Sequence, residues 1–303
     1  MWLNPIVKKD VKVQSRSMKI CWGVFAYEII LALTFFFAMI LIRQQNLNST
    51  DNIYSVMVWL YPVLAITQLV VLGMVVPVRT AASISGEKER QTFDIMMTTS
   101  MTPFSIVWGK VMTAVVQSML FVVASMPIMA LPFIIGGMSW SYLFWFLAIA
   151  FLVSFFAASI GILCSSICKK SVGAVVMSYA IYLVFFIGTG IPYLVYQIVS
   201  VSTNYTAGRG GDDLILFLLV NPAVYLLEFV AWVMVGESIM NTFWSPSGWG
   251  APGVQNQGLI YHVATGHRWI ILSTVLLLAI SFLFLWLASK RINPIRRHRK
   301  KRG

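Results

Sequence analysis

The 303-residue chain is 59% hydrophobic and only 11% charged, and its mean hydropathy is +0.82. A soluble globule of this length needs more polar residues to cover its surface, so the composition excludes that class and indicates an integral membrane protein. The formal net charge of +12 comes from basic residues that flank apolar runs, without the interleaved aromatic residues of a base-stacking surface. We interpret this charge as an orientation signal that also attracts anionic membrane lipid, and we expect no nucleic acid partner.

Six apolar runs are long enough to cross a membrane. A hydrocarbon core of about 30 Å requires roughly 20 apolar residues in a helix. The predicted spans are 20–42, 53–78, 111–135, 142–167, 172–200 and 269–289. The fold class that follows is an all-α integral membrane protein with one transmembrane domain over residues 1–303. Residues 1–19 alternate basic and apolar positions after Asn4-Pro5, which predicts an interfacial helix on the inner membrane surface.

The basic residues predict how the spans are oriented. Five precede the first span, four lie between the second and third, two lie between the fourth and fifth, and eight follow the sixth in the tail 290–303. With both termini in the cytosol, 19 of the 22 lysines and arginines are cytosolic, as the positive-inside rule requires. We expect a multi-pass protein of a cell membrane, and of a bacterial plasma membrane in particular.

A seventh apolar run, residues 214–235, needs a separate interpretation. Asn221-Pro222 splits it into two pieces that are too short to cross alone, and Glu228 lies within it. A full span here would place the basic tail outside, against the positive-inside rule. We therefore predict a re-entrant hairpin within the long outer loop 201–267, with its backbone buried against protein. Two roles stay open for Glu228, which could line an exit path or face water.

The sequence contains little catalytic chemistry. It has no G-x-x-x-x-G-K-[ST] loop to hold ATP phosphates, so any ATP-driven motor must be another chain. The three histidines, His262, His267 and His298, lie outside the predicted spans and offer no intramembrane metal cluster. We expect a protein that is not an enzyme and that holds no metal or cofactor of its own.

Three polar residues within the spans form a candidate intramembrane polar site. Glu28 is the only clear carboxylate in a span, and Gln68 and Gln117 are uncharged residues in reach of the bundle interior. An intramembrane acid is a functional candidate by default. However, Glu28 lies only about two turns into its span, so structural pairing with a cytosolic-side lysine is the interpretation that we favour.

The segment 79–110, between the second and third spans, is the most informative part of the chain. It is charged and helix-prone, with Glu87 and Gln91 spaced i, i+4, and likewise Arg90 and Asp94. Thr102-Pro103 then has the form of an N-cap followed by proline at the first helical position. A structured cytosolic helix between two spans gives another protein a surface on which to push.

This segment resembles the coupling region of the type-2 ABC exporter permeases. The family pattern is an acidic-basic run, then Thr-aliphatic-Glu, two or three aliphatic residues, Thr-Pro-Leu, and a Gly-Lys that opens the next span. Here it reads Glu87-Lys88-Glu89-Arg90, Thr92-Phe93-Asp94, Ile95-Met96-Met97, Thr98-Thr99-Ser100-Met101, Pro103 and Gly109-Lys110. Gln91 stands where glycine is frequent, Asp94 where glutamate is usual and Ser100 where proline is usual. The order of surface helix, spans, coupling segment and hairpin is also similar to that family.

The resemblance implies the permease subunit of an ATP-driven ABC exporter. Its partners would be a separate ABC ATPase, which binds the ATP and Mg, and a second permease, identical or homologous. Glu87, Arg90 and Asp94 would form polar pairs with the ATPase, and Phe93, Met96 and Met97 an apolar plug. The transport path would run between the permeases near spans two and five, and the outer hairpin with Asn221, Pro222 and Glu228 would act as its gate.

Three alternatives stay open. A secondary transporter driven by an ion gradient would need an intramembrane charged relay, for which only Glu28 is available. A scaffold or sensor subunit could recruit an ATPase without moving a substrate. The coupling segment could also be an amphipathic helix that rests on the lipid surface.

Overall fold

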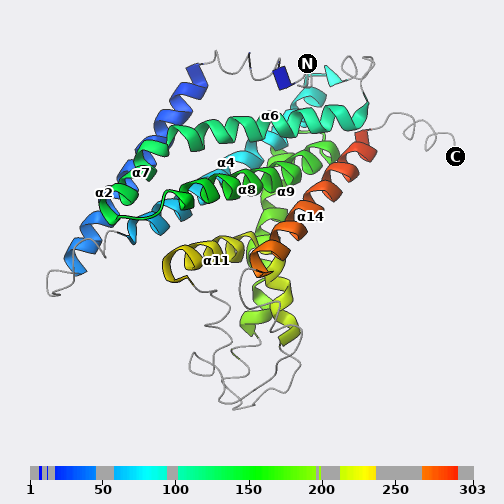
Figure 1. Ribbon diagram of the computed structural model, residues 1–303. Helices are drawn as coiled ribbons and strands as arrows, with labels where there is room; N and C mark the ends of the chain where they lie inside the picture. Colours follow the sequence, from blue (N-terminus) through cyan, green and yellow to red (C-terminus); the bar gives the residue numbers. More distant parts are fainter. Residues whose placement is uncertain are drawn as a thin grey trace, which may run out of the picture. The chain divides into compact units, whose positions relative to one another are not determined.

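The computed structural model describes residues 7–8, 12, 18–45, 58–93, 102–195, 198, 212–236 and 268–292. Every regular element in these ranges is helical, which confirms the all-α prediction (Figure 1). In chain order they are α2 (Met18–Gln45), α4 (Leu60–Glu89), α6 (Pro103–Ala124), α7 (Met126–Gly136), α8 (Ser141–Ile167), α9 (Ser171–Leu183), a π-helical segment η1 (Val184–Gly188), a 3₁₀ helix η2 (Asp212–Val220), α11 (Pro222–Val235) and α14 (Arg268–Ile292). The predicted interfacial helix at 1–19 falls mostly outside the described residues and stays a prediction.

Six helices in the described ranges are long and apolar enough to cross a membrane, as the sequence predicts. Two of them differ from the predicted spans. The second span is predicted to end at residue 78, but α4 continues to Glu89 because the charged residues after the apolar run are compatible with a helix. The third is interrupted at Ser125, where Pro127 has no backbone N–H to donate to the carbonyl of Val123.

The chain divides into two compact units, and each is described by itself. The first contains Met1–Tyr179 and Ile280–Gly303. Within it α4 packs against α2, α6, α7 and α8, and α6 packs against α8. In α8, 78% of the apolar 18-residue stretch is buried, whereas in α2 only 22% of the corresponding stretch is buried. Helix α8 therefore lies in the core of this unit, and α2 leaves most of its apolar surface for lipid.

Close helix packing in the first unit depends on a small residue and on aromatic rings. A Cβ atom on Gly161 of α8 would lie 2.9 Å from the Cβ of Thr80 and 3.0 Å from the carbonyl oxygen of Pro77, both on α4. Only glycine permits this approach of two backbones, as is common where membrane helices cross. Elsewhere, the Trp108 ring of α6 stacks on Phe282 of α14 with centroids 6.0 Å apart.

The second unit, Ala180–Ala279, is built around the break at Asn221-Pro222. The Asn221 side-chain oxygen accepts a hydrogen bond from the backbone N–H of Ala223 at 2.8 Å and so caps α11. Its amide nitrogen donates to the carbonyl of Phe186 in η1 at 2.9 Å. Trp269 is fully buried against the cluster of Leu218 and Leu219. The predicted break is confirmed, and the re-entrant path through a membrane stays a prediction.

Candidate functional site at the end of helix α4

Helix α4 ends in a left-handed turn at Gln91. The backbone N–H of Gln91 donates to the carbonyl of Lys88 at 3.2 Å, and that of Thr92 donates to the carbonyl of Glu87 at 3.0 Å. This pair of bonds is a Schellman motif, which requires a residue of positive φ, and Gln91 has φ +59°. The resemblance places a frequent glycine at this position, and the motif gives the physical reason. The helix ends before Gln91, so the predicted i, i+4 pair of Glu87 with Gln91 is wrong.

Lys88 and Glu89 hold the facing ends of α8 and α9. The Lys88 Nζ donates to the backbone carbonyls of Ser165 at 3.0 Å and Ser166 at 2.6 Å, at the C-terminus of α8. The Glu89 carboxylate accepts from the hydroxyl of Ser171 at 2.6 Å and from its backbone N–H at 3.2 Å, at the N-terminus of α9. Each charge is opposite to the partial charge of the helix end that it contacts, so both contacts are electrostatically favourable.

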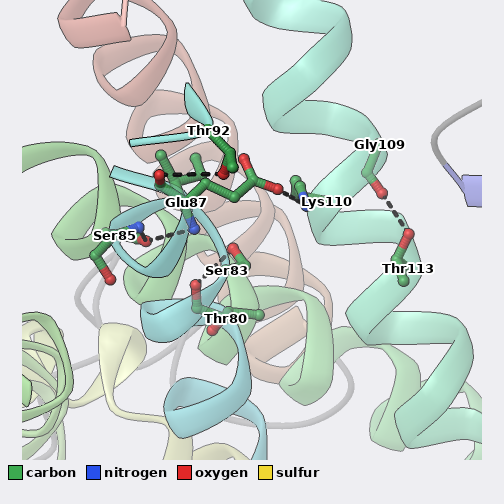
Figure 2. Close-up of polar contacts among 10 residues, drawn as sticks. Thr80, Ser83, Ser85, Glu87, Thr92, Gly109, Lys110 and Thr113 are labelled. Atoms are coloured by element: carbon green, nitrogen blue, oxygen red, sulfur yellow. Dashed lines mark hydrogen bonds and ion pairs between the residues drawn. The ribbon is translucent and has the colours of Figure 1, made fainter. Parts of the chain in front are cut away.

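Glu87 joins α4 to α6. Its Oε1 lies 2.7 Å from the Nζ of Lys110, and the side chains of Glu87 and Lys110 are only 27% and 12% exposed (Figure 2). The other carboxylate oxygen of Glu87 is buried and has no hydrogen-bond partner among the described residues. This partial burial makes the ion pair stronger than a fully exposed one.

Ser165 forms a second connection from α4 to α8. Its hydroxyl oxygen accepts the backbone N–H groups of Ile84 at 2.9 Å and Ser85 at 2.8 Å. A side-chain oxygen from α8 thereby enters the backbone hydrogen-bond network of α4, one turn from the contacts of Lys88. Together with Glu87, Lys88 and Glu89, this bond ties the last two turns of α4 to α6, α8 and α9. We call residues 84–89 and their contacts the α4 clamp.

The predicted coupling residues fall partly within the described chain. Arg90 is exposed directly after the α4 clamp, and Phe93 is partly buried, with its ring centre 5.8 Å from the Nζ of Lys88. Asp94, Met96 and Met97 lie outside the described residues. Thr102 is the N-cap of α6 as predicted, since its hydroxyl accepts from the backbone N–H of Ser105. Glu87 pairs with Lys110 of the same chain, and its expected polar pairing with an ATPase stays a prediction.

The candidate intramembrane polar site is only partly assembled. Gln68 is fully buried, and its amide nitrogen donates to the hydroxyl of Ser125 at 2.8 Å, at the break between α6 and α7. One carboxylate oxygen of Glu28, the amide oxygen of Gln68 and the amide nitrogen of Gln117 are buried without a partner among the described residues. Tyr27 lies near Ser125, Gln68 and Glu28, and sequence reasoning missed it. The lysine partner expected for Glu28 stays a prediction, since the Lys19 side chain lies outside the description.

At the predicted outer gate, Asn221, Pro222 and Glu228 are all buried. Glu228 is 1% exposed within the chain. The alternative in which Glu228 faces water is therefore wrong, because α11 packs that side chain inside the second unit. The gate role itself stays a prediction.

The sequence profile described as "ABC-2 family transporter protein" matches residues 39–290. The chain belongs to this family, and it is therefore a multi-pass membrane protein of the ABC transporter permease class. Domains of this kind are membrane components without an ATPase site of their own. No curated protein sequence matches the chain at a significant level.

Proposed function

We propose that this chain is the permease subunit of an ATP-driven exporter, and that a separate ABC ATPase docks on the segment that follows the α4 clamp. The observation that carries the proposal is the clamp itself. A membrane helix that runs on to Glu89 is fixed there to three other helices by Glu87, Lys88, Glu89 and Ser165. Force applied just beyond Glu89 would therefore move four helices together.

The chemistry of the exposed residues suits a docking surface. Arg90 is exposed directly after the clamp, and the partly buried Phe93 adds an aromatic group three residues further along the chain. Arginine and aromatic residues are enriched among the side chains that dominate the energy of protein interfaces. We therefore divide the predicted coupling residues into two groups, with Arg90 and Phe93 for docking and Glu87 for transmission within the permease. Asp94, Met96 and Met97 are proposed to extend the docking surface.

The remaining parts of the proposal come from the family. A second permease, identical or homologous, would complete the transport path near spans two and five. The ATPase would bind the ATP and Mg, and both termini of this chain would be cytosolic. The scarcity of charge within the spans favours an amphipathic or apolar substrate over a bare ion.

The test is co-purification of the tagged chain from its native membrane in mild detergent, with mass spectrometry of the captured proteins. The wild type is expected to capture a P-loop ATPase. The double variant R90A/F93A is expected to lose most of it. A matched control is R43A/F36A, which removes the same two residue types from exposed positions on α2. That control should capture as much ATPase as the wild type.

A second variant separates docking from transmission. E87Q keeps the size of the side chain but removes its charge from the pair with Lys110, so the ATPase should still be captured while the stimulation of its activity by the permease falls. Capture of no ATPase by the wild type would contradict the proposal and favour a transporter driven by an ion gradient, with Glu28 as the next residue to test. Capture of an ATPase whose hydrolysis never responds to the permease would favour a scaffold or sensor subunit.

A further inference from the structure

Two cysteines and a methionine gather at the junction of α8 and α9, next to the α4 clamp. Cys164 and Cys168 are four residues apart at the C-terminus of α8, and the backbone N–H of Cys168 donates to the carbonyl of Cys164 at 2.9 Å. This helical spacing puts the two side chains on one face, with their Cβ atoms about 5–6 Å apart. Across the junction, the sulfur of Cys168 lies 3.7 Å from the thioether sulfur of Met177 on α9. The fold therefore brings three sulfur-bearing side chains together.

These side chains are largely enclosed, and positive charge lies beside them. Cys164 is buried, whereas Cys168 and Met177 are only partly buried and so leave an approach from outside. Both cysteines are free thiols. The Lys88 Nζ lies 3.3 Å from the backbone carbonyl of Cys168, and the exposed Lys169 follows directly in the chain. The junction thus combines sulfur ligands with neighbouring cations.

The available ligands select the class of ion. The described residues contain no group of three or more histidine, cysteine, aspartate or glutamate side chains that could hold a metal, which is unfavourable for ions that prefer oxygen or nitrogen. Zinc takes four ligands in its structural sites, and thioether sulfur is not among its usual ligands. Thiolate and thioether sulfur together suit the soft ion Cu(I).

We propose that Cys164, Cys168 and Met177 bind one Cu(I) ion in a trigonal sulfur site. At a metal–sulfur distance of about 2.3 Å, three sulfurs around one ion lie about 4 Å apart, close to the 3.7 Å between Cys168 and Met177. On binding, each cysteine forms a sulfur–copper bond and releases its thiol proton to solvent, and the oxidation state of the copper does not change. The ion and its two thiolates carry one net negative charge, which the nearby Lys88 partly balances.

The bound ion would link the end of α8 to α9, beside the contacts of Lys88 and Glu89. Because it binds the folded junction, Cu(I) should raise the melting temperature of the protein. A bound ion would contradict our expectation from the sequence that the chain holds no metal, which followed from the positions of the histidines. The site does not depend on the proposed ATPase partner.

The test is an anaerobic titration of the purified full chain, without a polyhistidine tag, with Cu(I) held by a competing colorimetric chelator. The wild type is expected to bind one Cu(I) per chain, and X-ray absorption should show three sulfur neighbours at about 2.3 Å. C168S should weaken binding by more than about 100-fold, because a hydroxyl is a poor ligand for a soft ion and loss of an outer-shell partner alone costs about 10–100-fold. M177L keeps the volume but removes the sulfur, and it should weaken binding by about tenfold.

C21A is the matched control, since it removes the exposed cysteine of α2 and should bind Cu(I) as the wild type does. C164A leaves a small apolar residue at a buried position, should also lose the ion, and covers the case in which C168S fails to fold. Zn²⁺ should bind much more weakly than Cu(I). The proposal is overturned if the folded wild type binds no Cu(I), or if C164A and C168S bind it as the wild type does. It is also overturned if M177L leaves the affinity and the three sulfur neighbours unchanged, or if Zn²⁺ binds as tightly as Cu(I).

Discussion

Two of the places in the described part of the chain where side chains hold helix ends differ in their chemistry. At the α4 clamp, the cation of Lys88 and the anion of Glu89 contact the ends of α8 and α9. At the break in the second unit, the neutral amide of Asn221 caps α11 and binds the carbonyl of Phe186. Glu89 is exposed, whereas Asn221 is 3% exposed.

The difference follows from solvent access. Water lowers the cost of a charge at Glu89, so two opposite charges can match two helix dipoles. At Asn221 an unpaired charge would be costly, and one amide supplies both an acceptor and a donor. Charged side chains therefore mark the end of the protein that is proposed to meet a partner. Neutral polar side chains hold the breaks in its apolar interior.

The largest effect is expected at the helix crossing that supports the clamp. G161A places a methyl group 2.9 Å from the Cβ of Thr80, and should lower stability by about 3 kcal/mol because α4 and α8 must move apart. The measurement is the apparent melting temperature in detergent and the yield of monodisperse protein. G173A is the matched control, since nothing lies within 4 Å of the added carbon. Equal melting temperatures for the two variants would show that the crossing is not close-packed.

Replacing Asn221 tests whether a neutral amide is required at the buried helix break in the second unit. N221A should lower stability by about 2 kcal/mol, because it removes the cap and leaves the carbonyl of Phe186 without its donor. N221D keeps the acceptor but places a charge at a buried position, and it should be at least as destabilising. E89Q, an equivalent change of charge at an exposed site, should alter the melting temperature little. A larger decrease in melting temperature for E89Q than for N221D would contradict the explanation based on solvent access.

The ion pair of the clamp should make a smaller contribution. A double-mutant cycle with E87Q and K110M is expected to give a coupling energy of about 1 kcal/mol, between the values for exposed and buried pairs. The readout is denaturant unfolding of all four proteins in the same detergent. If the effects of E87Q and K110M on the free energy of unfolding are additive, the contact at 2.7 Å contributes nothing to stability. Transmission from α4 to α6 through this pair then loses its support.

The smallest expected effect is a gain in stability at position 91. Q91G should raise stability by about 0.5 kcal/mol, since glycine adopts positive φ without the strain of glutamine but loses more entropy on folding. Q91A has the same strain as the wild type and should show no gain. An equal melting temperature for Q91G and Q91A would argue that the Schellman turn is not formed in the protein.

The sequence predicted the helices better than the side-chain contacts between them. Run lengths and basic residues predicted six spans, and Thr102-Pro103 and Asn221-Pro222 predicted a helix start and a break. The roles of Lys88 and Glu89 were missed, because adjacent opposite charges are also typical of a solvated helix end. The partners of Lys88 on α8, Ser165 and Ser166, are 77 and 78 residues away along the chain. No local pattern encodes such a contact, and only the fold brings it together.

The most direct test of the account is site-specific photo-crosslinking in native membranes. A benzoylphenylalanine at position 93, just beyond the α4 clamp, should crosslink to a P-loop ATPase, and the same probe at position 36 on the exposed face of α2 should not. Identification of the ATPase by mass spectrometry at position 93 alone is the predicted result. A folded protein that captures only lipid at position 93, or the ATPase equally from both positions, would contradict docking at the end of α4.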